Sequence, residues 1–233
     1  MDKNVHSGIN IGLDLLQCVS SSDDKKKVEK YEAELQKQEC ERLFSRYKKS
    51  GVPSKFFDQS FDTFIAETEA EKSILAQCKD FANNPKNRVL VLCGNNGNGK
   101  THLGSSILRE NIFNDKDGMY ILSSAMCIKY DSAIGYKVDM NREEVVQYYS
   151  RTPMLIIDEC CKYFLNSELE KFLLVLIICN RYENNLPTVL ITNSEKRAFI
   201  DFLGKAVYDR FTEVCTTLDF NWQSRRKSNR AVE

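Results

Sequence analysis

The stretch GNNGNGKTHL, from Gly94 to Leu103, contains the residues of this chain with the clearest chemistry. The spacing Gly94-x-x-x-x-Gly99-Lys100-Thr101 matches a phosphate-binding loop, in which glycines allow backbone N–H groups to turn toward phosphate oxygens. The Lys100 ammonium would bridge the β and γ phosphates of a nucleotide, and the Thr101 hydroxyl would ligate Mg²⁺. The predicted nucleotide-binding residues are Gly94, Asn95, Asn96, Gly97, Asn98, Gly99, Lys100, Thr101 and His102.

A glycine-rich turn that carries a lysine by chance is the alternative to a phosphate loop. The surrounding sequence argues against it, because the apolar run VLVLC precedes the motif and a helical pattern follows it. A phosphate loop joins a strand to the N-terminus of a helix, whose dipole attracts anions. The motif therefore has the neighbours that a phosphate loop requires.

Two acidic residues, Asp158 and Glu159, end a second apolar run, MLIIDE. Open α/β sheets bind their ligands at the carboxyl ends of their strands. Asp158 is therefore predicted to reach Mg²⁺, and Glu159 to act as the general base that polarises an attacking water. The pair favours hydrolysis over phosphotransfer, since a phosphotransferase must exclude water. The alternative is two acidic residues that merely end a strand in solvent.

A third apolar run, TVLITNS, ends in Asn193. An amide there can orient a water molecule or contact the γ phosphate, although asparagine after a strand is more often a turn residue. Its position after the acidic strand and an intervening helix favours the catalytic role. The chain has no N-K-x-D motif for reading guanine, so ATP with Mg²⁺ is the predicted cofactor.

The elements that must position these residues alternate along the chain from Arg88 onward. Runs typical of strands are VLVLC, MYILSS, MLIID and TVLIT, and helical patterns separate them in THLGSSILRENIF, EEVVQYY and SELEKFLLVLIICNRYE. This alternation predicts an α/β fold with a mostly parallel sheet.

A charged segment, residues 23–50, precedes the alternating region. It contains neither glycine nor proline, and its apolar residues from Val28 to Tyr47 lie mostly at helical spacing. Gly51 and Pro53 end the predicted helix. Its apolar stripe could lie along a partner helix, or it could fold back on its own domain. The predicted division is a helical partner-binding segment at 1–52 and an ATPase domain at 53–233.

Composition limits where this chain works and what it binds. Lysine plus arginine equals aspartate plus glutamate, at 33 each, so no overall field draws the chain to nucleic acid or to an anionic membrane. The longest apolar run, FLLVLIIC, is too short to cross a bilayer, and the N-terminus lacks the features of a signal peptide. Nine cysteines without a C-x-x-C pair indicate reduced thiols. We expect a cytoplasmic protein without a membrane partner.

With these motifs in place, the chain resembles the AAA+ ATPases, and more closely the DnaC-type loaders of the bacterial replicative helicase together with the transposition helper IstB. The resemblance spans about Gly51 to Arg226 and is carried by GVPSKF leading to SFDTF, GNNGNGKTHL, LIIDE, NRYE, LITNS, FLGKAVYDRF and DFNWQSRR. It implies an AAA+ (RecA-like) αβα sandwich with a parallel five-stranded sheet. A small helical N-terminal segment would precede this sandwich, and a full C-terminal lid domain would be missing.

The resemblance also assigns roles to two arginines. Arg210, in VYDRF, stands where the family has the arginine finger that reaches the γ phosphate of a neighbouring subunit. Arg226, in NWQSRR, matches a second family arginine that senses nucleotide within its own subunit. The alternatives are a solvated helix residue for Arg210 and a basic tail for Arg226. After the acidic pair, DECCKYF departs from many relatives, which carry a small residue or glycine there, so this loop is expected to differ in shape.

Single-stranded DNA is a partner that the resemblance implies, and one stretch could bind it. Between Lys129 and Arg151 tyrosines alternate with basic residues, and bases stack on aromatic rings while cations follow the backbone. Loaders and initiators insert an extra helical element at this place. Tyrosines that pack a helix against the sheet are the alternative. The candidates are Lys129, Tyr130, Tyr136, Lys137, Tyr148, Tyr149 and Arg151.

The leading hypothesis is an ATP-hydrolysing loader that places a DnaB-type replicative DNA helicase on single-stranded DNA. Such a loader would self-associate through its ATPase domain when bound to the helicase. The alternatives are a transposition helper on the same ATPase core and an adaptor that binds ATP as a switch with little turnover. Glu159 and Arg210 argue against the adaptor.

Overall fold

Five parallel strands form one sheet in the order β2-β3-β4-β1-β5. The computed structural model describes residues 22–85, 89–135, 139–162, 167–210 and 212–225. The central strands are buried on both faces, which explains their continuous apolar runs. The edge strand β5 has the mixed sequence CTTLDF, and its own pattern did not predict it. The strands are β1 (Val89–Gly94), β2 (Met119–Leu122), β3 (Leu155–Cys160), β4 (Thr188–Thr192) and β5 (Cys215–Phe220).

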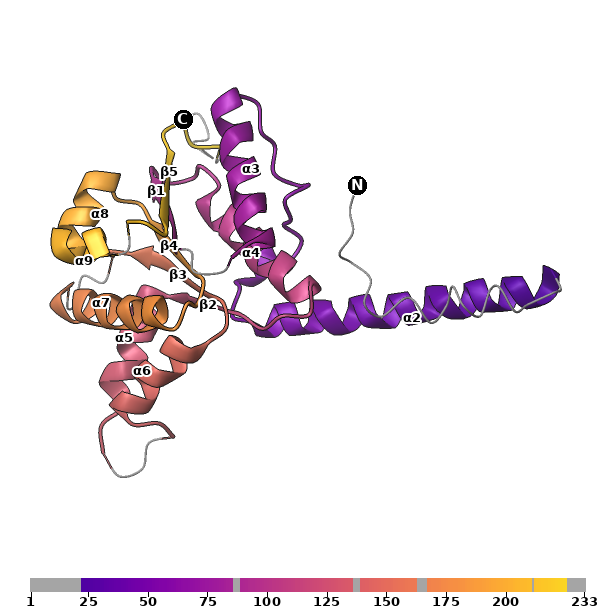
Figure 1. Ribbon diagram of the computed structural model, residues 1–233, viewed down its shortest axis with the longest axis horizontal. Coiled ribbons are helices and arrows are strands. Elements are labelled where there is room, and N and C mark those ends of the chain that lie inside the picture. Colours follow the sequence, from indigo (N-terminus) through magenta and orange to yellow (C-terminus); the bar gives the residue numbers. More distant parts are fainter. Residues whose placement is uncertain (1–21, 86–88, 136–138, 163–166, 211, 226–233) are drawn as a thin grey trace, which may run out of the picture.

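Helices cover both faces of the sheet (Figure 1). On one face α3 (Glu69–Asn83) and α4 (Lys100–Phe113) pack against alternate strand residues such as Leu90 and Leu92. The intervening residues Val89 and Val91 belong to a second core on the other face. That core is covered by α5 (Ser123–Ser132), α6 (Arg142–Arg151), α7 (Ser167–Glu183), α8 (Lys196–Leu203) and α9 (Lys205–Arg210). The predicted αβα sandwich with a five-stranded parallel sheet is confirmed. In the part of the chain that the structure describes, only α8, α9 and β5 follow β4.

The N-terminal helix α2 (Ser22–Lys49) extends away from the rest of the chain as a long rod (Figure 1). Its Tyr31 and Leu35 side chains are 62% and 46% exposed, whereas Leu43 and Tyr47 are buried. The apolar stripe is therefore divided: its last turns pack against α4, and its earlier part lies free of the domain. The division at residue 52 stays a prediction. None of the helices among the described residues is both long and apolar enough to cross a membrane.

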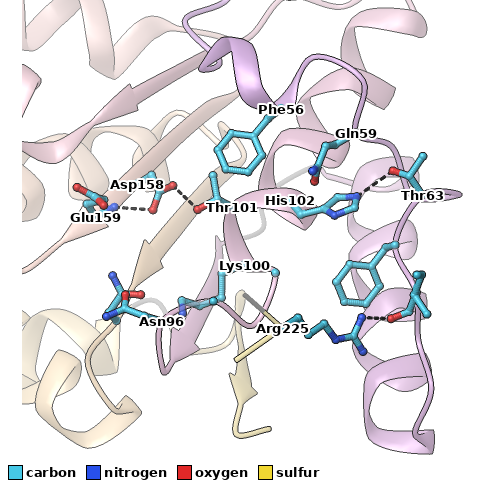
Figure 2. Close-up of a pocket in the computed structure, with 15 residues that line it drawn as sticks. Phe56, Gln59, Thr63, Asn96, Lys100, Thr101, His102, Asp158, Glu159 and Arg225 are labelled. Carbon is cyan, nitrogen blue, oxygen red and sulfur yellow. Dashed lines mark hydrogen bonds between the residues drawn. The ribbon is translucent and has the colours of Figure 1, made fainter. Parts of the chain in front are cut away.

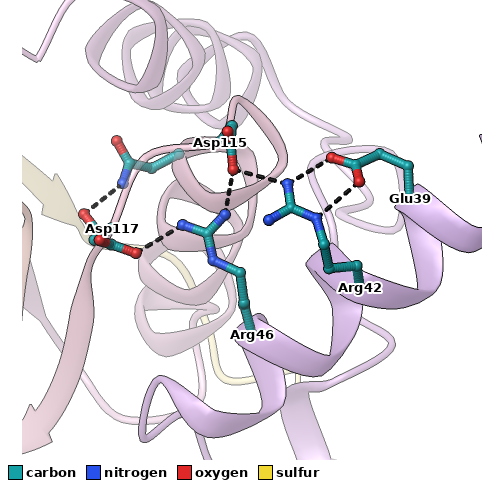
Figure 3. A network of polar contacts seen from close by, with 6 residues as sticks. Glu39, Arg42, Arg46, Asp115 and Asp117 are labelled. Atoms are coloured by element: carbon teal, nitrogen blue, oxygen red, sulfur yellow. Dashed lines mark hydrogen bonds and ion pairs between the residues drawn. The ribbon is translucent and has the colours of Figure 1, made fainter. Parts of the chain in front are cut away.

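A network of charged side chains surrounds the contact between α2 and the loop after α4 (Figure 3). Arg42 and Arg46 both pair with Asp115, and Arg46 also pairs with Asp117 at 2.6 Å. Glu39 holds the guanidinium of Arg42 within the helix. Exposed ion pairs of this kind contribute little to stability, because water and salt screen the charges. The buried residues at the end of α2 therefore hold this helix more firmly than its charges do.

Arg181, in the motif NRYE, lies buried at the end of the sheet opposite the predicted site. Its guanidinium donates to the carbonyl oxygens of Tyr149, Thr152 and Pro187 and to the hydroxyl of Thr188. Burial lowers the pKa of Arg181, and these acceptors stabilise its charged form. The arginine thus joins the ends of α6 and α7 to the start of β4, and its role is structural.

Candidate functional site

The loop between β1 and α4 folds around the Lys100 side chain. Lys100 Nζ donates hydrogen bonds to the carbonyl oxygens of Gly94 at 2.8 Å and Asn95 at 2.6 Å, so the cation lies across the loop. Gly99 precedes the helix with a φ of 92°. A Cβ at Gly99 would lie 2.6 Å from the ring of Phe64, so both the backbone conformation and the space require glycine. The loop therefore has the strand–loop–helix setting that the motif requires.

Asp158 lies beside this loop, at the carboxyl end of β3, and is buried. Its Oδ2 accepts hydrogen bonds from Thr101 Oγ1 at 2.8 Å and from the Tyr120 hydroxyl at 2.5 Å. Its Oδ1 accepts from the Glu159 N–H at 2.6 Å. Oxygen ligands of these two kinds suit Mg²⁺, so Thr101 and Asp158 fit the predicted ion. Burial and the Asp158 carboxylate raise the pKa of Tyr120, which keeps its hydroxyl a donor.

Glu159 is turned away from Asp158 by an irregularity in β3. Ile157 pairs with Leu190 while Cys160 pairs with Thr192, so β3 has one extra residue between these pairs. Glu159 lies in this bulge with a φ of 58°, an uncommon conformation for a residue other than glycine. Such strain costs on the order of 1–3 kcal/mol and occurs often at functional sites. The bulge leaves the Glu159 side chain 47% exposed and paired with Lys162 at 3.2 Å.

Glu170 of α7 is buried and anchors Cys161, the residue directly after β3. Its Oε1 accepts hydrogen bonds from the Cys161 N–H at 2.8 Å and from the Ser123 hydroxyl at 2.6 Å. Cys161 has a φ of 67°, in the left-handed region that favours glycine. Burial raises the pKa of the Cys161 thiol to about 12, so this thiol is protonated and weakly reactive at neutral pH.

A pocket of about 350 Å³ opens between the phosphate loop and residues 56–65, the connector between α2 and α3 (Figure 2). The predicted site residues that line it are Asn96, Gly97, Gly99, Lys100, Thr101, His102, Asp158, Glu159 and Asn193. Lining residues that were not predicted are Phe56, Gln59, Thr63, Phe64, Ile65 and Arg225. The pocket therefore combines the phosphate loop with a more apolar wall supplied by the connector.

His102 joins α4 to the connector. Its Nε2 lies 2.8 Å from the Ser60 carbonyl oxygen and 3.1 Å from the Thr63 hydroxyl, and its ring packs edge-on against Phe64. Burial lowers the pKa of His102, so the imidazole is neutral at pH 7. The predicted nucleotide-binding residue His102 thus lines the pocket and also holds its apolar wall in place.

Asn98 links the phosphate loop to the end of β5. Its side-chain amide donates to the carbonyl oxygens of Phe220 at 2.8 Å and Trp222 at 2.5 Å. Like Gly94 and Asn95, Asn98 does not appear among the residues that line the pocket. The Asn98 side chain therefore holds the loop against the end of β5 and does not face the pocket.

Arg225 reaches the pocket from the C-terminal segment. Its N–H donates to the Gly97 carbonyl at 3.0 Å, and its guanidinium lies over the Phe64 ring and bonds the Ile65 carbonyl and the Glu71 carboxylate. Burial acts to raise the pKa of Glu71, but backbone donors and Arg225 outweigh it and lower this pKa. Arg225 is in the quoted motif NWQSRR, one position before the predicted Arg226, which lies outside the described residues.

Two further predicted residues lie at element ends. Asn193 directly follows β4 and lines the pocket, where its amide can face a phosphate or a water. Arg210 is the last residue of α9, and its side chain lies outside the described part of the structure. The role of Arg210 at a neighbouring subunit stays a prediction.

The tyrosine-rich stretch of α5 and α6 contains both buried and exposed rings. Tyr149 is buried in the second core, as expected for a tyrosine that packs a helix against the sheet. Tyr148 is 41% exposed, and the Lys129 ammonium lies 4.5 Å from the centre of its ring. Tyr136 and Lys137 lie outside the described residues. Of the pair Lys129 and Tyr148, Tyr148 is therefore the exposed member and Lys129 is partly buried, and their contact with DNA stays a prediction.

Known proteins share the sequence pattern and the fold of this chain. The profile of a family described as IstB-like ATP binding protein matches residues 24–232. The replicative helicase loader DnaC of Buchnera aphidicola subsp. Baizongia pistaciae is 27% identical over 199 residues, which cover 84% of this chain and 80% of that protein. The same loader of Escherichia coli K12 is 25% identical over 202 residues, which cover 84% and 79%. A crystal structure of the DnaC helicase loader superposes with a TM-score of 0.60 at 20% identity, over 72% of this chain and 99% of that chain.

Proposed function

The chain belongs to the family of IstB-like ATP-binding proteins, and from this membership we propose that it binds ATP with Mg²⁺ and hydrolyses it in the pocket beside the phosphate loop. The observation that carries this proposal is the meeting of Lys100, Thr101, Asp158 and Glu159 at one edge of the sheet. A chance glycine-rich turn would not place a lysine, a hydroxyl and a buried carboxylate around one pocket, with the hydroxyl bonded to the carboxylate.

Each group has a task in this proposal. The loop N–H groups and Lys100 would bind the phosphates, and Thr101 with Asp158 would hold the metal ion. A bound Mg²⁺ ion would neutralise charge on the β and γ phosphates. Glu159, exposed at the pocket and held by the bulge, accepts a proton from the attacking water, which Asn193 helps to orient. The connector wall, with Phe64 and Ile65, offers apolar surface for the base.

We further propose that the chain loads a DnaB-type replicative helicase onto single-stranded DNA, as the names of its relatives suggest. The support within this chain is α2, whose Tyr31 and Leu35 are exposed on a helix that extends away from the domain. An amphipathic helix with an uncovered apolar stripe is suited to a partner's groove. A transposition helper on the same core is the second candidate, because the matching family is described as IstB-like.

Removal of residues 1–38 is expected to abolish association with a DnaB-type helicase while ATP affinity stays within about twofold of the parent. The cut removes the exposed Tyr31 and Leu35 but keeps Leu43 and Tyr47, which belong to the domain core. Capture of purified helicase by the tagged protein measures the first effect, and calorimetry with ATP measures the second.

Point variants separate the apolar stripe from the rest of the helix. Tyr31→Asp with Leu35→Asp should reproduce the deletion, whereas Ala33→Asp with Lys37→Asp, an exposed pair at the same spacing on another face, should not. Helicase capture by the truncated chain at the parental level would exclude this use of α2. Capture of a transposase in place of the helicase would favour the transposition helper.

If Arg210 acts at the neighbouring subunit, two inactive variants should restore each other. Arg210→Ala keeps its own Glu159, and Glu159→Gln keeps its own Arg210, so mixed assemblies contain interfaces with both groups intact. ATP turnover in mixtures should therefore exceed the sum of the separate variants. Absence of recovery at every ratio, with mixed assembly confirmed by light scattering, would exclude an arginine supplied in trans.

A further inference from the structure

Tyr120 of β2 contacts two parts of the molecule that are distant in the sequence. Its hydroxyl donates to Asp158 Oδ2 at 2.5 Å, and its backbone N–H donates to the Ser50 carbonyl oxygen at 2.8 Å. The ring between these contacts is buried in the core between the sheet and α4. One residue therefore connects the carboxylate of the proposed metal site with the end of α2.

The hydroxyl of Tyr120 restricts how the Asp158 carboxylate can turn. A carboxylate offers about four lone-pair sites. Three of them are taken by donors, because Thr101 and Tyr120 share Oδ2 and the Glu159 N–H occupies Oδ1. Rotation of the carboxylate would break these bonds inside a buried environment, where an unpaired polar group is costly. Tyr120 therefore fixes the direction in which Asp158 presents its remaining acceptor site.

The end of α2 in turn fixes Tyr120. β2 is the edge strand next to β3 in the described sheet, and the Ser50 carbonyl oxygen accepts its Tyr120 N–H on the side away from β3. Gly51 follows with a φ of 94°, and a Cβ there would overlap the Tyr120 carbonyl oxygen. Ser50 and Tyr47 are themselves buried, so the chain at this point has little freedom to move.

We propose that Tyr120 is a positioning residue for the metal-binding carboxylate Asp158, and that the end of α2 sets its position. The proposal rests on the proposed Mg²⁺–nucleotide site. Outer-shell partners of metal ligands typically contribute 10–100-fold to metal affinity. A partner that bends or pulls α2 would then change the affinity of the site for its metal ion without touching the nucleotide.

Tyr120→Phe tests the first contact, because it keeps the buried ring and removes only the hydroxyl. With the protein in excess over a non-hydrolysable ATP analogue, so that little free analogue chelates the metal, the variant should bind Mn²⁺ about 10-fold more weakly than the parent, as measured by electron paramagnetic resonance of free Mn²⁺. Nucleotide affinity in EDTA should not change. Tyr149→Phe removes a hydroxyl from a buried tyrosine of the second core, on the other face of the sheet, and should leave Mn²⁺ affinity unchanged.

Gly51→Ala tests the second contact, because the added Cβ pushes the end of α2 away from Tyr120. Mn²⁺ affinity should fall in this variant too, whereas Gly204→Ala, with a φ of 93° but nothing within 4 Å of the new Cβ, should behave as the parent. Unchanged Mn²⁺ affinity in Tyr120→Phe overturns the inference while leaving the proposed ATP site intact. A parent protein that binds no nucleotide overturns the proposed function and the inference with it.

Discussion

Replacement of Lys100 by alanine is expected to abolish ATP binding. The Lys100 ammonium lies across the phosphate loop and would be the buried cation closest to the β and γ phosphates. Removal of one partner from a buried, hydrogen-bonded charge pair costs about 2–5 kcal/mol, which corresponds to a loss of affinity of about 30-fold to a few thousandfold. Calorimetric titration with Mg²⁺–ATP measures this loss directly.

Two controls separate lost binding from lost structure. Lys72→Ala removes an exposed lysine from α3 and should bind ATP as the parent does. Lys100→Ala also frees the carbonyl oxygens of Gly94 and Asn95, so circular dichroism and thermal unfolding must confirm that the domain is folded. A folded Lys100→Ala protein that binds ATP as tightly as the parent would show that this loop is not the phosphate site.

Replacement of Glu159 by glutamine is expected to preserve ATP binding and to reduce turnover by about 10²–10⁴-fold. Glutamine has nearly the same shape and can occupy the same bulge, but it cannot accept a proton from water. The substitution changes neither the proposed phosphate-binding residues nor the Asp158 carboxylate, so affinity should stay close to that of the parent. Phosphate release under saturating ATP measures turnover, and calorimetry measures affinity.

The ion pair between Glu159 and Lys162 needs its own control, since the glutamine variant weakens it as well. Lys162→Ala removes the pair and retains the carboxylate, and it should keep turnover within a few fold of the parent. If Lys162→Ala is as slow as Glu159→Gln, the carboxylate acts through this ion pair and is not the general base.

The meeting of the glycine loop with the acidic pair could be predicted because the geometry of each is local. A strand, a glycine loop and a helix follow one another in the chain, and Lys100 and Thr101 belong to that single unit. To place Asp158 beside this unit, only one further rule is needed: the carboxyl ends of parallel strands meet at one edge of the sheet. The hydrogen bond between Thr101 and Asp158 is what these two rules together require.

Contacts that depend on strand order and loop path could not be predicted. Tyr120 reaches Asp158 because β2 pairs with β3, a long-range choice that no residue of MYILSS specifies. The bulge that exposes Glu159 leaves no pattern in LIIDEC, and it appears only once β3 is paired with β4. Arg225 reaches the pocket only because β5 returns the chain beside β1.

The attachment of the C-terminal segment to the phosphate loop has a spectroscopic consequence. Trp222 is the one tryptophan of the chain, and its ring packs 4.9 Å from that of Phe220. Its carbonyl accepts the Asn98 amide, and within the described structure its indole N–H is buried without a hydrogen-bond partner. Because indole emission responds to polarity and to nearby rings, a rearrangement of the loop alters the fluorescence of a single known residue. The protein therefore carries an intrinsic optical reporter of loop movement, readable in real time without a dye.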